Sequence, residues 1–174
     1  MTQALPVLRG LPPLLDVNTR LVVLGSFPGV ASLRTQQYYG HPQNQFWKIM
    51  ATLLSPNAAE VLAMPYAERS QCLLNQGVGL WDVYAACVRE GSLDTNIQNA
   101  QPNDLLGLRT RCPNLVAIAH NGGESFKHAK LTQALGVSVY RLPSTSPAHA
   151  SWRLAQKLEA WREVLILSGL DVLI

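Results

Sequence analysis

The sequence has few of the residues that mark disordered or membrane-spanning proteins. Charged residues make up only 14% of the 174 positions while apolar residues make up 48%, a balance that argues against disorder. The apolar residues come in short runs, and none approaches the roughly 20 in a row that a membrane-spanning helix needs. We therefore expect a single folded domain over residues 1–174 that does not associate with a membrane.

Cysteine is also scarce. Cys72, Cys87 and Cys112 are odd in number and far apart, so they offer neither a disulfide framework nor the paired ligands of a zinc or iron–sulfur site. We expect all three to be small buried or half-buried residues. No set of histidines and carboxylates has metal-ligand spacing either, and we predict no metal and no cofactor.

The N-terminal stretch and the net charge give only weak indications of location and ligand. The N-terminal stretch has no basic start followed by a clean apolar run, so it does not resemble an export signal, and we expect a cytoplasmic protein. The 14 basic and 11 acidic residues give a net charge of +3, which is compatible with a polyanionic partner. Because the basic residues are scattered rather than gathered in a patch, charge alone identifies no ligand.

Short apolar strands alternate with amphipathic helices along the chain, a pattern typical of an α/β fold with a parallel sheet covered on both faces. Strands are expected at 21–24, 77–83, 115–119 and 137–142. Helices are expected over 44–54, 58–76 and 104–111, and from Gly123 to about Ala134, with a long polar loop over 89–103.

The last helix is expected to open at Ser146-Pro147, a cap followed by a first-turn proline. It would place His149 in its first turn, and it aligns a stripe of Leu154, Leu158, Trp161 and Leu165. We expect the four tryptophans, at positions 47, 81, 152 and 161, to lie in the core because their neighbours are apolar.

Ligands of such folds bind beyond the carboxyl ends of the strands. The segments that follow the predicted strands are 25–44, 82–99, 120–124 and 143–149, and they are also the stretches with the most unusual composition. We therefore predict the functional site in these segments.

The first of these segments carries the most information. Gly25, Pro28 and Gly29 favour a tight turn where backbone can approach a ligand. Tyr38 and Tyr39, together with neighbouring amides, would suit a planar base that is stacked and read by hydrogen bonds. The alternative is an ordinary strand-to-helix loop in which Asn44 serves as the helix N-cap.

This segment also resembles a known family. The stretch GSFPGVASL…QYYGHPQNQFW is similar to the first motif of hypoxanthine-DNA glycosylases, a branch of the uracil-DNA glycosylase superfamily. Its HPxNxFW portion also resembles mismatch-specific uracil and thymine glycosylases. Further along, LPSTSPA (142–148) is similar to the superfamily's minor-groove loop, and GVGLWD (77–82) to the strand that ends at the base-recognition residue. The resemblance runs from about Leu21 to Trp161.

The resemblance implies a fold and an activity. The fold would be a three-layer α/β/α sandwich with a central, mainly parallel four-stranded sheet. The protein would be a monomeric, monofunctional DNA glycosylase of base excision repair that removes hypoxanthine from deoxyinosine in DNA. Lysines are few, and only Lys48 falls within a motif, so no amine is in place for a glycosylase-lyase mechanism.

The resemblance also implies roles for individual residues. Superfamily members commonly carry Asp, Asn or Glu just before the motif's proline, where this chain has Phe27. The catalytic role then passes to Asn44, whose amide can position water and stabilise charge. Phe27 would either stack on the flipped base or pack under its own loop. The implied base-binding residues are Gly25, Ser26, Phe27, Tyr38, Tyr39, Asp82 and Asn121.

Asp82 lies where uracil-specific members carry a base-reading Asn. An ionised Asp accepts hydrogen bonds only, so it could accept from N1–H of hypoxanthine; alternatively it caps the next segment or pairs with an Arg. Leu142 stands where other members have a histidine, so histidine-assisted departure of the base is not implied. The implied DNA contacts are Pro28, Gly29, His41, Pro143, Ser144, Thr145, Ser146 and His149.

Two other hypotheses stay open at this point. One is a uracil or mismatch-specific uracil/thymine glycosylase on the same fold. The other is a catalytically silent DNA- or nucleotide-binding module, which the departures at Phe27 and Leu142 favour.

Overall fold

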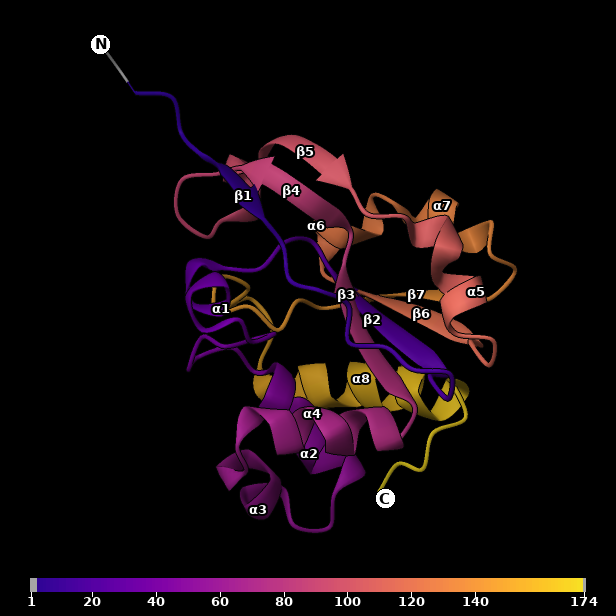
Figure 1. Ribbon diagram of the computed structural model, residues 1–174. Helices are drawn as coiled ribbons and strands as arrows, with labels where there is room; N and C mark the ends of the chain where they lie inside the picture. The colour runs from indigo at the N-terminus through magenta and orange to yellow at the C-terminus, as the bar shows by residue number, and fades with distance from the viewer. Residues whose placement is uncertain (1–2, 174) are drawn as a thin grey trace.

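The computed structural model describes residues 3–173 and contains two sheets (Figure 1). The larger sheet has four parallel strands in the order β3-β2-β6-β7. Its members are β2 (Leu21–Gly25), β3 (Val78–Asp82), β6 (Ala117–Asn121) and β7 (Ser138–Leu142). A smaller antiparallel sheet joins β1 (Val7–Arg9), β4 (Tyr84–Val88) and β5 (Gln98–Pro102).

Helices cover both faces of the larger sheet (Figure 1). One layer consists of α2 (Phe46–Leu54), α4 (Tyr66–Asn75) and α8 (Leu154–Leu167), with α3 (Ala58–Ala63) packed beside α2. The other contains α5 (Leu108–Arg111), α6 (Gly123–Phe126) and α7 (Ala129–Gln133). Single 3-10 turns span Asp94–Asn96 and Leu105–Gly107, and α1 (Val30–Thr35) follows β2.

The alternation of side chains along β2 builds both halves of the core. Leu21 and Val23 pack with the α2, α4 and α8 layer, whereas Val22 and Leu24 pack with the opposite layer. All four side chains have no exposed surface. The central strand is thus buried on both faces, which explains its continuous apolar run. The predicted three-layer α/β/α sandwich around a parallel four-stranded sheet is confirmed.

The register of the parallel strands aligns their carboxyl ends. Gly25 of β2 pairs with Asp82 of β3, and Asn121 of β6 pairs with Leu142 of β7. The loops that follow these strands therefore begin side by side at one edge of the sheet, as expected for a doubly covered parallel sheet.

Several predicted elements differ from the structure. The helix expected over 58–76 is two helices, because Pro65 lacks an N–H donor and disfavours helical backbone at Met64. The stretch expected to be a long loop over 89–103 contains strand β5, whose pairing with β4 depends on a distant partner rather than on its own polar residues. The helix expected from Gly123 to about Ala134 is the pair α6 and α7.

The last helix begins later than predicted. Ser146 accepts hydrogen bonds from Ala148 N–H and His149 N–H, which completes one isolated turn. Helix α8 starts only after Arg153, whose N–H donates to the Gln156 side chain. His149 therefore precedes the helix instead of lying in its first turn.

The predictions for cysteine and tryptophan have mixed outcomes. Cys87 and Cys112 are buried, Cys72 is half-buried, and all three are free thiols, as predicted. Trp47, Trp81 and Trp161 lie in the core, but Trp152 is 43% exposed because it sits in the turn before α8. Within residues 3–173, no helix is long and apolar enough to span a membrane.

Candidate functional site

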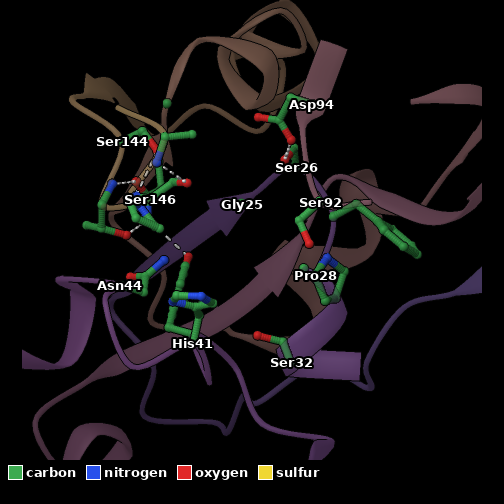
Figure 2. A pocket seen from close by; sticks show the side chains of 18 of the residues that line it. Gly25, Ser26, Pro28, Ser32, His41, Asn44, Ser92, Asp94, Ser144 and Ser146 are labelled. Atoms are coloured by element: carbon green, nitrogen blue, oxygen red, sulfur yellow. Dashed lines mark hydrogen bonds between the residues drawn. The ribbon is translucent and has the colours of Figure 1, made fainter. Parts of the chain in front are cut away.

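A cavity of about 550 Å³ opens at the carboxyl edge of the parallel sheet. Its walls come from the loops after β2, β4, β6 and β7, which are far apart in sequence (Figure 2). Nearly every residue predicted to form the site lines this cavity: Gly25, Ser26, Phe27, Pro28, Gly29, Tyr38, Tyr39, His41, Asn44, Asp82, Asn121, Ser144, Thr145, Ser146 and His149. Pro143 is the exception, and its carbonyl accepts a hydrogen bond from Trp161 at 3.3 Å.

The floor of the cavity is the junction of Gly25 and Asp82. A methyl group at residue 25 would lie only 2.4 Å from Asp82 Oδ1, so the glycine leaves the space that the carboxyl group occupies. Asp82 is 6% exposed, and its Oδ2 atom is buried with no hydrogen-bond partner among the described residues. The site therefore offers a buried oxygen that a ligand N–H could satisfy.

Burial also changes the charge of this group. Desolvation, together with the nearby Asp94 carboxylate, raises the pKa of Asp82 to about 7, although the Arg89 guanidinium acts in the opposite direction. Asp82 pairs with no arginine within 4 Å among residues 3–173, which argues against the ion-pair role considered from the sequence. A carboxyl group that titrates near neutral pH in a cavity is a common property of functional sites.

We expect Gly25→Ala to distort this floor. The new methyl group would force the Asp82 carboxyl away from β2, and overpacking of this kind costs about 1–3 kcal/mol of folding free energy. Gly29→Ala is the matched control on the same loop, since its added methyl would meet Ser92 at an ordinary 3.5 Å. Thermal unfolding of both variants measures the difference, and equal stability of the two would contradict the close packing of Asp82 on Gly25.

Asn44 lies half-buried at the side of the cavity, just before α2. Its Oδ1 accepts a hydrogen bond from Phe46 N–H at 2.9 Å and so satisfies a free N–H at the start of α2, although the N-cap residue is Gln45 rather than Asn44, as the alternative had it. The bond uses one lone pair of the oxygen. No bond to the Nδ2 amide is found within the described residues, so the cap leaves this donor free for a ligand or water.

The two tyrosines of the first loop differ in their surroundings. Tyr38 is buried, and its hydroxyl donates to Pro12 O at 2.8 Å, which anchors the ring beneath the loop. Tyr39 stacks on Phe46 with ring centroids 4.1 Å apart, and its hydroxyl accepts from Asn121 Nδ2 at 3.2 Å. Burial raises the pKa of both phenols well above their usual range, so both remain neutral.

Asn121 joins three segments of the site. Its Nδ2 donates to Thr145 Oγ1 at 3.0 Å as well as to Tyr39, while its Oδ1 accepts from Thr145 N–H at 3.0 Å. Thr145 is fully buried, and its carbonyl accepts from Gln45 N–H. These bonds use the Asn121 amide to position the 143–146 loop, and they leave Ser144 and Ser146 on the cavity side (Figure 2).

Phe27 and three histidines near the site make packing contacts or hydrogen bonds within the protein. Phe27 is 6% exposed, with the Arg89 guanidinium 5.2 Å from its ring centroid, so the ring packs under its loop while also lining the cavity. His41 is exposed and accepts from Gln43 N–H. His149 is half-buried, and burial lowers its pKa. His120 is fully buried between Ser125 and Thr132, which lowers its pKa to about 4.

Sequence reasoning missed the loop after β4. Ser92, Leu93, Asp94 and Thr95 all line the cavity, yet none was selected as a site residue. The sequence pattern places the segment 82–99 at the functional edge of the sheet, and that position is the signal that could have found them. The return of the chain through β4 and β5, which carries these residues over the first loop, has no local marker in the sequence.

The site can hold a flat, polar ring. A ligand ring could place an N–H group against Asp82 at the floor and lie beside the tyrosine rings, with the Asn44 amide nearer the opening. Among residues 3–173, no group of three or more His, Cys, Asp or Glu side chains has a geometry that could hold a metal ion.

Comparisons with known proteins find a matching family and similar relatives. Residues 12–165 match the model of the uracil DNA glycosylase superfamily. Two curated proteins named hypoxanthine DNA glycosylase are similar over most of their length. The protein from Methanosarcina barkeri is 35% identical, with 89% of this chain and 96% of its own covered. The protein from Methanosarcina acetivorans is 36% identical, with 90% and 96% covered.

A solved structure has the same fold. The solution structure of a Methanosarcina acetivorans protein, described as a candidate uracil DNA glycosylase, superposes with a TM-score of 0.81 at 34% identity. The match covers 94% of this chain and 99% of that one, so the similarity extends over nearly the whole fold.

Proposed function

This chain belongs to the uracil-DNA glycosylase superfamily, and from that membership we propose that it is a hypoxanthine-DNA glycosylase. It would hydrolyse the N-glycosidic bond of deoxyinosine in DNA and leave an abasic site for base excision repair. The curated relatives named for this activity, at 35–36% identity over about nine-tenths of the chain, support the proposal. The base must leave the helical stack to reach the cavity, because a stacked base cannot contact Asp82 at its floor.

The buried oxygen of Asp82 is the observation that carries the choice of hypoxanthine over adenine. Hypoxanthine presents N1–H next to its O6 carbonyl, and the unpartnered Oδ2 atom would accept from that N–H. Adenine has an acceptor at N1, which would face the ionised form of Asp82 without a hydrogen bond. A buried oxygen left unpaired in this way disfavours adenine strongly, so undamaged DNA would be spared.

Asn44 is the proposed catalytic residue. Its free Nδ2 donor would hold the attacking water, or the developing charge, close to C1′ of the sugar. Water, rather than an amine, is the proposed nucleophile, because no lysine lines the cavity in the described part of the chain. The enzyme would accordingly release the base without cutting the strand.

The loop residues at the mouth are proposed to contact the DNA backbone. Ser144 and Ser146 present hydroxyl groups on one side of the opening, while Pro28 lies across from them (Figure 2), and Gly29 also lines the cavity. Hydroxyl and backbone N–H groups suit phosphate contacts that position DNA without reading its sequence. We also propose that the protein acts as a monomer and that it is located in the cytoplasm.

The substrate is tested with four synthetic duplexes, carrying deoxyinosine, deoxyuridine, deoxyxanthosine or a thymine mismatch, treated with enzyme and then hot alkali. We expect alkali-dependent cleavage at deoxyinosine to be fastest, with little strand cutting before alkali. Uracil is the second candidate, since its N3–H beside a carbonyl would also suit Asp82. Cleavage at deoxyuridine alone would overturn the hypoxanthine assignment, and tight binding without any abasic product would indicate a silent binding module.

A further inference from the structure

A second carboxylate lies at the mouth of the cavity, on the loop that follows β4. Asp94 lines the same cavity as Asn44, and in Figure 2 these two side chains lie on opposite sides of Gly25. Asp82 at the floor is buried, Asn44 is half-buried and Asp94 is exposed. With the base at the floor, the attached sugar would lie at the level of Asn44 and Asp94.

This loop is held against the rest of the site by three polar contacts. Ser26 Oγ donates to Asp94 Oδ1 at 2.6 Å, Val30 N–H donates to Ser92 Oγ at 2.9 Å, and Arg89 Nη2 donates to Pro28 O at 2.7 Å. All three contacts join residues more than 60 positions apart. The Asp94 carboxylate is thus fixed beside the first loop before any substrate binds, which is a property of an organised catalytic group.

The charge of Asp94 is not neutralised by an ion pair. The side-chain ion pairs among residues 3–173 join Lys127 to Glu124 and Arg162 to Glu159. A carboxylate at the mouth repels DNA phosphates, so its charge opposes binding. It would instead attract the positive charge that develops on the deoxyribose as the glycosidic bond breaks.

We propose that Asp94 is a catalytic carboxylate of this enzyme, stabilising the positive charge at C1′ and accepting a proton from the attacking water. The inference rests on the proposed function. The C1′–N9 bond breaks and its electron pair leaves with hypoxanthine, while the water oxygen forms a bond to C1′. One water proton passes to Asp94, and from there through solvent to the departing base, so the carboxylate is restored.

The groups around Asp94 determine its pKa and, through it, how the rate of base release should vary with pH. Although the residue as a whole is exposed, its carboxyl group is desolvated beside Ser26, which raises its pKa above the ordinary range, and the neighbouring Glu124 adds to this effect. The Ser26 hydrogen bond, Arg89 and Lys127 lower the pKa in part, and the Asp82 carboxyl also lies nearby. Only the ionised form of Asp94 accepts a proton. The rate of base release should therefore be low at pH values below the pKa of Asp94 and rise as the pH passes through it.

Asp94→Asn is the direct test, since its amide oxygen can still accept from Ser26 while the negative charge is lost. We expect the single-turnover rate of hypoxanthine release to fall about 100-fold, with the acidic limb of the pH–rate profile reduced. Ser26→Ala keeps the carboxylate but removes the bond that lowers its pKa, so the acidic limb should move to higher pH. Asp104→Asn, whose carboxylate caps Gly107 outside the cavity, is the matched control.

The outcomes separate this inference from the proposed function. If Asp94→Asn retains the wild-type rate and pH profile, Asp94 only tethers its loop and the inference is wrong, while the glycosylase assignment stands. If the rate falls but the pH profile keeps its shape and the melting temperature drops, the loss is structural and also overturns the inference. If the wild-type protein releases no base from any duplex, the proposed function itself fails.

Discussion

Asn44→Ala is expected to reduce hypoxanthine release by about 1,000-fold or more. The substitution removes the Nδ2 donor that would position water or stabilise charge beside C1′, and misplacement of a reacting group together with loss of a charge-stabilising donor has effects of this size. The rate should be measured under single-turnover conditions with a deoxyinosine duplex, so that slow product release does not hide the chemical step.

The capping bond of Asn44 needs its own control. Loss of the Oδ1 bond to Phe46 N–H costs about 1 kcal/mol of folding free energy, which alone would lower the melting temperature slightly. Asn44→Asp keeps an oxygen for the cap but has no amide donor, so it should fold like the wild type and still be inactive. An Asn44→Ala variant that releases hypoxanthine at the wild-type rate would show that the residue serves only the start of the helix.

Asp82→Asn is expected to stabilise the protein above neutral pH while weakening its activity. The Asp82 carboxyl is buried, and its Oδ2 atom has no hydrogen-bond partner among the described residues. Because burial disfavours the ionised form, the pKa of Asp82 is raised from 3.8 to about 7. Between these two values the unfolded chain has lost the proton that the folded protein keeps, so stability falls as pH rises through this window. At pH 8 the cost of ionising the buried carboxyl is on the order of 4 kcal/mol, which the neutral amide would avoid.

Thermal unfolding at two pH values checks the stability effect. The melting temperature of Asp82→Asn should exceed that of the wild type by about 8–16 °C at pH 8, with a much smaller difference near pH 4. Asp104→Asn, which keeps a capping oxygen for Gly107, should change stability by less than about 0.5 kcal/mol at both pH values. A difference for Asp82→Asn that does not depend on pH would mean that Asp82 carries no such cost.

The same variant tests the reading of the base. Replacing a carboxylate by an amide exchanges a charge-assisted hydrogen bond to N1–H for a neutral one that is about half as strong. We expect hypoxanthine release at pH 8 to fall about 10-fold or more. The amide can also donate to N1 of adenine, so the ratio of hypoxanthine to adenine release should fall as well. Unchanged values for both would exclude Asp82 from the recognition of the base.

The sequence predicted much of the fold because its signals are local. The all-apolar run of β2 indicated a strand buried on both faces, and the periodicity of 44–54 indicated a helix. Errors occurred where distant contacts decide the outcome. Strand β5 is polar and exposed, and it forms only because β4 supplies a hydrogen-bonding edge.

The sequence by itself placed the candidate site and its first loop, since Gly25 and Asn44 belong to one continuous segment with recognisable turn residues. Only the tertiary structure decided the burial, the pKa and the hydrogen-bond partners of Asp82 and Asp94. The pairing of Gly25 with Asp82 buries a carboxyl without a partner, and a hydrogen bond spanning 68 positions brings Asp94 to Ser26. Burial, pKa and charge at the mouth all arise from such long-range contacts, which leave no fixed spacing in the sequence.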